Sequence, residues 1–209
     1  MIIVARVVNS APMRMLGKIS PPSRKNVVFG LFKSKKYADT ADRLYRSIIE
    51  QARLPIFYSG YGVPDTVDGR FDMIVLHAHI LFDRLKDGDA ADEELSQAVF
   101  DLMFADMDQN LREMGVGDIG VAKRIKAMAE AFYGRATAYA VALKKEGDTD
   151  LTAALKRNVY RKSEPSEQQL NAATTYFRTQ IAHVGAQNLM GFQKGDVSFK
   201  PPGVVASSS

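Results

Sequence analysis

Apolar residues recur at spacings of three and four positions along most of the chain between residues 39 and 190. This spacing places apolar side chains on one face of a helix, and no stretch has the strict alternation typical of a β-strand. The pattern predicts helices over about residues 39–54, 69–87, 91–114, 119–146, 149–162 and 166–190. We therefore expect an all-α fold, a single bundle-like domain of about six helices over residues 39–190.

Helix-breaking and helix-capping residues support these boundaries. Pro55 ends the first helix, and Asp65 or Asp68 is suited to cap the second. Gly115 is suited to the position after a helix, where the backbone turns left-handed. Gly117 then turns the chain, and Asp118 begins the fourth helix.

The helix at 69–87 is apolar on two sides. Its inward stripe consists of Phe71, Ile74, Ala78, Leu81 and Leu85, and the stripe on the other side consists of Met73, Leu76 and Ile80. A helix with two apolar sides is either central in its bundle or faces a partner. The sequence leaves both alternatives open.

Charge is unevenly distributed between the N-terminal arm and the rest of the chain. Residues 1–38 carry eight Lys and Arg and no acid, whereas residues 39–209 carry 20 bases and 24 acids. We expect a basic, mostly unstructured arm that is either solvated or attracted to anionic lipid or RNA. Residues 191–209, rich in Gly, Pro and Ser, are expected to form a flexible tail.

The loop at 55–70 carries Phe57, Tyr58 and Tyr61 close to Pro64. Such a set is typical of a contact surface. The alternative, favoured for Phe57 and Tyr58, is that the aromatic rings fold back over the core.

The composition excludes several kinds of chemistry. The chain has no Cys, which removes thiol catalysis, Cys-ligated zinc and iron–sulfur clusters. No phosphate-binding loop, nucleophile elbow or dinucleotide fingerprint is present. No apolar run approaches the roughly 20 residues of a membrane-spanning helix.

The histidines do not form a recognisable metal site. None has a Glu three residues before it, as a di-iron helical bundle requires. His77 and His79 lie about 200° apart around a helix, so they cannot share one ion without help. We expect both, and His183, to be boundary residues, with haem ligation by His77 possible in principle. Neither metal nor cofactor is expected.

The stretch from Asp101 to Gly120 carries five acids and one Arg. Helical spacing divides its polar residues into two lines, which consist of Asp101, Asp108 and Arg112, and of Asp106, Asn110 and Glu113. Arg112 follows Asp108 by four residues and is expected to pair with it. A solvated or partner-facing polar surface therefore explains the acids more simply than a magnesium–diphosphate site.

The same stretch carries a family resemblance. The loop GVPDTVDGRFDMIVLH at 62–77 and the block LSQAVFDLMFADMDQNLREMGVGDIGVAKRIKAMAEAFYGRATAY at 95–139 together resemble the ubiquinol–cytochrome c chaperone family. The segment LYRSIIEQARLPIFY at 44–58 fits as well. The resemblance covers about residues 40–160, and LREMGVGD is its best identifier.

The resemblance implies a non-catalytic all-α domain that binds newly made cytochrome b and stabilises it for assembly of ubiquinol–cytochrome c reductase, respiratory complex III. It also implies, for mitochondrial members, a small partner protein and the ribosome. Because this chain is shorter than those members and lacks their long leader, we expect the bacterial cytoplasm at the inner membrane, with the mitochondrial matrix as the alternative.

A contact surface for such a client can be proposed from the sequence. The arm would reach the inner membrane, while the second helix, the loop and the acidic stretch would touch the partner. The candidate partner-binding residues are Tyr61, Pro64, Arg70, Met73, Leu76, Ile80, Asp101, Asp108, Arg112, Glu113 and Asp118. The alternative function is a helical ligand carrier or enzyme that holds an isoprenoid, a quinone or haem.

Overall fold

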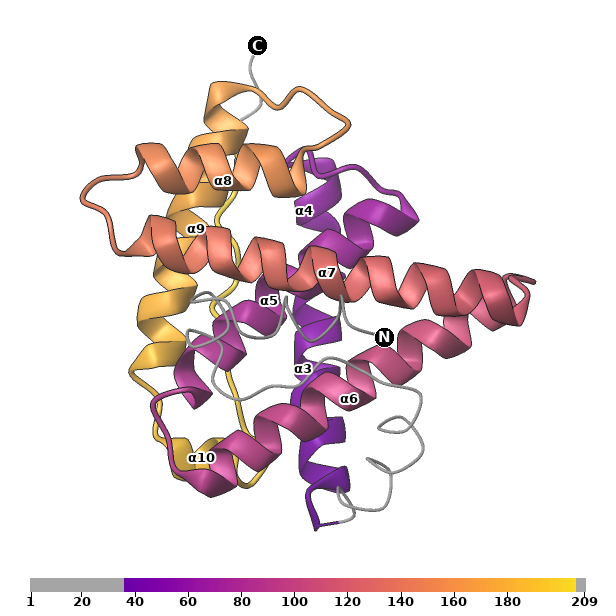
Figure 1. Cartoon of the computed structure of the whole chain (residues 1–209). Coiled ribbons are helices and arrows are strands. Elements are labelled where there is room, and N and C mark those ends of the chain that lie inside the picture. Colours follow the sequence, from indigo (N-terminus) through magenta and orange to yellow (C-terminus); the bar gives the residue numbers. More distant parts are fainter. Residues whose placement is uncertain (1–35, 206–209) are drawn as a thin grey trace. The chain divides into compact units, whose positions relative to one another are not determined.

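A computed structural model describes residues 36–205, so nearly all of the expected basic arm lies outside the described residues. The described part is helical and contains no strand, which confirms the all-α prediction (Figure 1). Its helices are α3 (Ala38–Ala52), α4 (Pro55–Ser59), α5 (Val67–Leu85), α6 (Ala90–Glu113), α7 (Asp118–Leu143), α8 (Thr149–Val159), α9 (Glu167–Gly185) and α10 (Leu189–Phe192).

The six predicted helices correspond to α3, α5, α6, α7, α8 and α9. The short helices α4 and α10 were not predicted. Pro55 ends α3 but also opens α4, because proline fits the first helical turn, where its missing N–H is not needed. In α10 the Asn188 side chain accepts a hydrogen bond from the backbone N–H of Met190.

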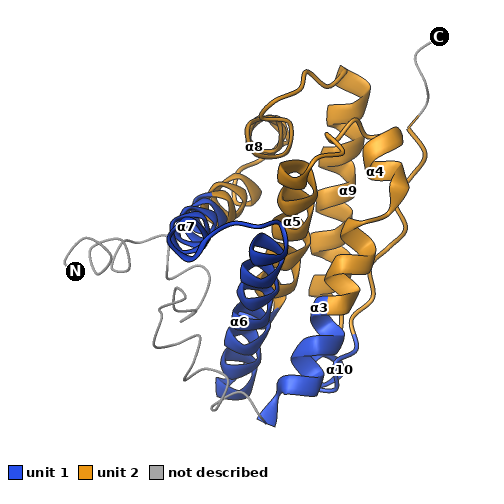
Figure 2. Cartoon of the chain, turned by 90° about the vertical axis from the view of Figure 1, so that its right-hand side faces the viewer, with its two compact units in different colours: residues 1–45, 85–134, 188–196 blue, residues 46–84, 135–187, 197–209 orange. Residues whose placement is uncertain are grey.

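The chain divides into two compact units that each draw on several segments (Figure 2). Within its described part, unit 1 comprises residues 36–45, 85–134 and 188–196. Its core includes the rings of Phe100, Phe104 and Phe132, with centroids 4.6 Å apart for the first two and 5.3 Å apart for Phe100 and Phe132. Asp89 and Asp92 form a capping box at the start of α6, and Gln193 donates a hydrogen bond of 3.1 Å to Asp92.

Unit 2 comprises residues 46–84, 135–187 and 197–205 of the described chain. Thr66 caps α5 by accepting a hydrogen bond from the N–H of Gly69, a role that the sequence pattern gave to Asp65 or Asp68. Ser166 and Gln169 form the capping box of α9. These caps satisfy backbone N–H groups that a helix start leaves unpaired.

Part of the C-terminal segment is held by side chains of α9 and of the turn that follows it. Gln180 donates to the carbonyl of Lys200 and accepts from its N–H, at 2.8 and 3.0 Å. Gln187 makes the same kind of double contact with the backbone of Ser198, at 2.7 and 3.0 Å. The sequence indicated a flexible tail from residue 191 and did not predict these hydrogen bonds.

A glycine in the middle of α7 allows the contribution of helix propensity to stability to be tested. Gly134 is exposed, and a Cβ added there would meet no described side chain or distant backbone within 4 Å. Replacing Gly134 with Ala is expected to raise the free energy of unfolding by about 0.5–1 kcal/mol, because glycine loses more backbone entropy in a helix. Urea unfolding measures this difference, and a less stable variant would show that the position is packed.

Candidate functional site

The α6–α7 corner, which we define as residues 105–126, carries four of the predicted contact residues, Asp108, Arg112, Glu113 and Asp118. α6 ends at Glu113, and Gly115 adopts the left-handed conformation with φ 79°. Its N–H donates to the carbonyl of Arg112 at 2.9 Å, and the N–H of Val116 donates to the carbonyl of Leu111 at 3.1 Å. These bonds satisfy carbonyls at the helix end, so Gly115 has the predicted role.

Arg112 ties the end of α6 to the start of α7. Its Nε donates to Asp108 at 2.6 Å, as the sequence spacing predicts, and its Nη1 donates to Asp118. All three side chains are partly exposed, so the group is a surface ion-pair cluster. It links the last turn of α6 to the first residue of α7.

The remaining acids of α6 contact separate partners. Asp101 accepts a hydrogen bond of 2.8 Å from Gln97, and Glu113 accepts one of 2.8 Å from Gln109. Burial raises the pKa of Asp101 above its usual value, which the bond from Gln97 opposes. Within residues 36–205 no three His, Asp or Glu side chains come together as a metal site would require.

Two apolar side chains stand on the surface of the corner. Ile119 is 87% exposed and Met114 is 53% exposed. Met114 is exposed because α6 has already ended at Glu113 and Met114 lies in the turn. Exposed large apolar residues beside a polar rim are typical of interaction sites.

Four of the predicted contact residues lie inside the fold instead. Tyr61, Met73, Leu76 and Ile80 are buried. For α5 this favours the first alternative left open by the sequence, a helix with both apolar sides packed. Buried side chains cannot touch a partner in this conformation, so the surface proposed below omits them.

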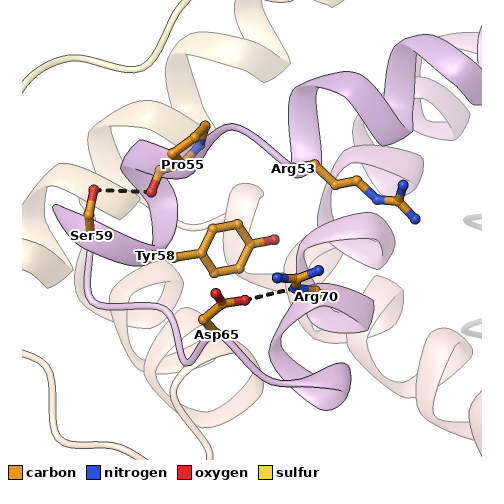
Figure 3. A pocket seen from close by; sticks show the side chains of 6 residues that line it. All are labelled: Arg53, Pro55, Tyr58, Ser59, Asp65 and Arg70. Carbon is orange, nitrogen blue, oxygen red and sulfur yellow. Dashed lines mark hydrogen bonds and ion pairs between the residues drawn. The ribbon is translucent and has the colours of Figure 1, made fainter.

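Side chains between residues 53 and 70 line a hollow (Figure 3). The hollow has a volume of about 480 Å³ and is lined by Arg53, Pro55, Tyr58, Ser59, Asp65 and Arg70. Arg70 pairs with Asp65 at 2.7 Å and lies 5.9 Å from the ring centre of the half-buried Tyr58. Phe57, which belongs to α4, and Tyr61, which follows it, are buried, with ring centres 5.4 Å apart.

His77 and His79 are buried, so their prediction as boundary residues is wrong. The Nδ1 of His77 donates to the carbonyl of Met73 at 2.8 Å, because a carbonyl can only accept. Its Nε2 then accepts from the hydroxyl of Tyr176 at 2.7 Å. With both ring nitrogens engaged, the geometry disfavours haem ligation by His77. His183, partly exposed and 3.2 Å from the hydroxyl of Ser198, is a boundary residue as expected.

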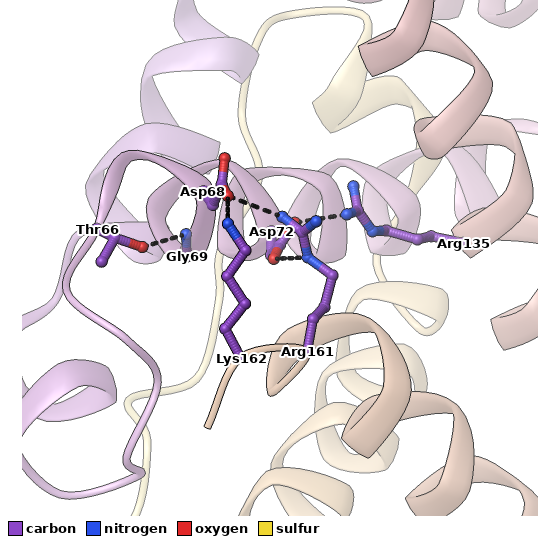
Figure 4. Close-up of polar contacts among 7 residues, drawn as sticks. All are labelled: Thr66, Asp68, Gly69, Asp72, Arg135, Arg161 and Lys162. Atoms are coloured by element: carbon purple, nitrogen blue, oxygen red, sulfur yellow. Dashed lines mark hydrogen bonds and ion pairs between the residues drawn. The ribbon is translucent and has the colours of Figure 1, made fainter. Parts of the chain in front are cut away.

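A buried ion cluster in unit 2 has no counterpart in the sequence predictions (Figure 4). The side chains of Asp72 and Arg135 are 3% and 6% exposed and pair at 2.8 Å. Arg161 contacts the other oxygen of Asp72 at 3.0 Å, and the guanidinium of Arg135 lies 5.3 Å from the ring centre of Phe71. At the edge of the cluster, Lys162 pairs with Asp68 at 2.7 Å. The cluster joins α5, α7 and the segment just after α8, which indicates a structural role.

The surface ion pairs of the corner are expected to contribute little to stability. Replacing Arg112 with Ala should lower the free energy of unfolding by less than about 1 kcal/mol, because solvent screens exposed pairs. Thermal unfolding of the purified variant measures this. A much larger loss would show that Arg112 holds the corner together and would make the variant unsuitable for functional tests.

The described residues define a class of protein: an all-α protein that carries an ion-pair cluster and exposed apolar side chains at one corner. Among the described helices none combines the length and apolar character needed to cross a bilayer. The model of the ubiquinol-cytochrome C chaperone family matches residues 59–199. The chain therefore belongs to this family, which confirms the resemblance seen in the sequence.

Named relatives and a solved structure agree with this assignment. The chain is 24% identical to the mouse ubiquinol-cytochrome c reductase complex assembly factor 1 over 85% of its length, and 26% identical to the human protein over 76%. It spans only 61% of the mouse protein and 53% of the human one. A crystal structure of the Cbp3 homolog from Brucella abortus matches 83% of this chain and 97% of that chain, with 35% identity and a TM-score of 0.72.

Proposed function

We propose that this protein is a non-catalytic chaperone that binds newly made cytochrome b and stabilises it for assembly of ubiquinol–cytochrome c reductase. The family match over residues 59–199 is the observation that carries the proposal. The names of the mouse and human relatives, assembly factors of that complex, support it. The bacterial inner membrane or its mitochondrial counterpart is the location that this function requires.

The α6–α7 corner is the surface that we assign to the client. Ile119 and Met114 offer exposed apolar area, and Asp108, Arg112 and Asp118 form a polar rim beside them. A client with membrane-spanning helices has apolar surface that must be shielded from water before insertion and assembly. Methionine suits such contacts because its unbranched side chain adapts to irregular partners.

A charge placed at the apolar centre of the corner tests this assignment. In a strain that lacks the chain, wild-type protein should restore cytochrome b, measured by reduced-minus-oxidised spectra, and Ile119→Asp should not. Val204→Asp is the matched control, because Val204 is 91% exposed and lies outside unit 1. Both variants should keep the wild-type melting temperature, since fully exposed substitutions change stability by only about 0.5 kcal/mol.

The outcomes test the chaperone function and the assigned client surface separately. Normal cytochrome b in the deletion strain would refute the chaperone proposal altogether. Full restoration by Ile119→Asp would leave the function standing and move the client contact away from the corner.

A further inference from the structure

The charges on the two arms of the α6–α7 corner have opposite sign. Residues 106–118 comprise the end of α6, the turn and the first residue of α7; there Asp106, Asp108, Glu113 and Asp118 outweigh Arg112, which gives a net charge of −3 (one base minus four acids). Over residues 119–130 of α7, Lys123, Arg124 and Lys126 outweigh Glu130, which gives a net charge of +2 (three bases minus one acid). Ile119 lies at the junction of the two regions.

The acidic side is fixed by contacts within unit 1. Arg112 is shared between Asp108 and Asp118. Asp106 accepts a hydrogen bond of 2.8 Å from the hydroxyl of Tyr45, and Glu113 is held by Gln109. These bonds orient the carboxylates but leave the net negative charge in place, because only Arg112 carries a positive charge.

The basic side of the corner carries positive charges that are not paired within the described chain. Lys126 lies 3.9 Å from Glu130, whereas Lys123 and Arg124 form no ion pair with any residue of the described chain. Ile119, Lys123 and Lys126 follow one another at spacings of four and three, so they share one exposed face of α7. Figure 1 shows the corner at the end of α6 opposite to α10.

We propose that the corner binds one class of segment in its partner: an amphipathic stretch with apolar residues at its centre, basic residues at one end and acidic residues at the other. The apolar centre packs on Ile119 and Met114, the basic end faces α6, and the acidic end faces α7. The inference rests on the proposed function, because it specifies which part of a client this surface recognises. It follows from charge complementarity, which selects partners by penalising like charges.

The size of the corner sets the length of the segment. Asp106 to Glu113 and Ile119 to Lys126 are eight residues each, and seven steps along a helix axis cover about 10 Å. A segment of about fifteen residues, close to four helical turns, would reach both charged regions. This length can be made as a soluble synthetic peptide.

Three labelled peptides with one shared apolar centre test the proposal with the full-length protein. The first has Lys at one end and Glu at the other, the second has Lys at both ends, and the third has Glu at both ends. Fluorescence anisotropy should show the first binding about tenfold more tightly than either of the others, a ratio that corresponds to about 1.4 kcal/mol. The difference should shrink in 0.5 M salt, because salt screens exposed charges.

Two protein variants make the test specific. Lys123→Glu with Arg124→Glu makes the whole corner acidic, so its preference should change to the peptide with Lys at both ends. Ile119→Asp should weaken the binding of all three peptides about tenfold. Circular dichroism and melting curves should match the wild type, since all three residues are exposed.

Equal affinity for the three peptides, or an unchanged preference in the double variant, would overturn the proposed charge recognition. Neither result would alter the chaperone proposal, which depends on cytochrome b in the deletion strain. Conversely, normal cytochrome b in that strain would refute the function even if the peptides bind as expected.

Discussion

Replacing Arg135 with Met is expected to lower the free energy of unfolding by about 3 kcal/mol, because it leaves the carboxylate of Asp72 buried without its nearest cation. The side chain of Asp72 is only 3% exposed, and Arg135 lies 2.8 Å away. Arg161 remains at 3.0 Å, which keeps the loss at the lower end of the range for a broken buried pair. Urea unfolding at pH 8 measures the change.

Two further variants separate this effect from a loss of packing. Lys162→Ala removes an exposed partner of Asp68 and should lower stability by less than about 1 kcal/mol. Adding Asp72→Leu to Arg135→Met should recover most of the lost stability, because no unpaired charge is then buried. If the double variant is no more stable than Arg135→Met alone, the loss comes from packing and not from charge.

The effect of Arg135→Met should also depend on pH. Burial raises the pKa of Asp72 to about 6. The positive charges of Arg135 and Arg161 lower this pKa, but by less than burial raises it. A folded-state pKa above the unfolded value of 3.8 means that the contribution of this carboxyl to stability falls as the pH rises from about 4 to 6. The protonated carboxyl needs no cation, so Arg135→Met should be closer to the wild type at pH 5 than at pH 8.

Lowering the pH from 7 to 5 is expected to reduce the stability of the wild type by about 2 kcal/mol more than that of His77→Gln. Burial lowers the pKa of His77 from 6.5 to about 4. The unfolded chain therefore takes up a proton in this range while the folded chain does not, so the contribution of His77 is present above pH 6.5 and is lost as the pH falls toward 4. Glutamine keeps a polar side chain there without this titration.

The comparison with His77→Gln is needed because Asp72 titrates over an overlapping range with the opposite sign. Both proteins retain Asp72, so its contribution cancels in the difference. Following the ring signals of His77 by NMR gives a direct measurement of its pKa. A value near 6.5, or parallel pH profiles for the two proteins, would contradict the prediction.

The sequence predicted what depends on local spacing. The periodic apolar residues gave the all-α class and the six long helices, and the four-residue step from Asp108 to Arg112 gave their ion pair. The position of Gly115 at the end of α6 was predicted in the same way, because a helix end that turns left-handed favours glycine. Each of these features is determined by residues within one or two helical turns.

The sequence could not predict contacts between distant segments. Asp72 and Arg161 are 89 residues apart, and nothing in the helical pattern of either segment indicates that they meet. The two apolar sides of α5 were visible, but whether Met73 and Ile80 face a partner or the core depends on tertiary packing. Among the predicted contact residues, the structure leaves Arg70, Arg112, Glu113 and Asp118 exposed. Their role in binding stays a prediction.

The division of the chain has a consequence for how the protein forms during synthesis. Unit 1 needs residues 188–196, where Phe192 is buried and Gln193 bonds Asp92, and unit 2 draws on residues beyond 197, where Lys200 bonds Gln180. Neither unit has all its parts until residues 188–200 have left the ribosome. A nascent chain that stops near residue 187 would therefore leave both units open at once.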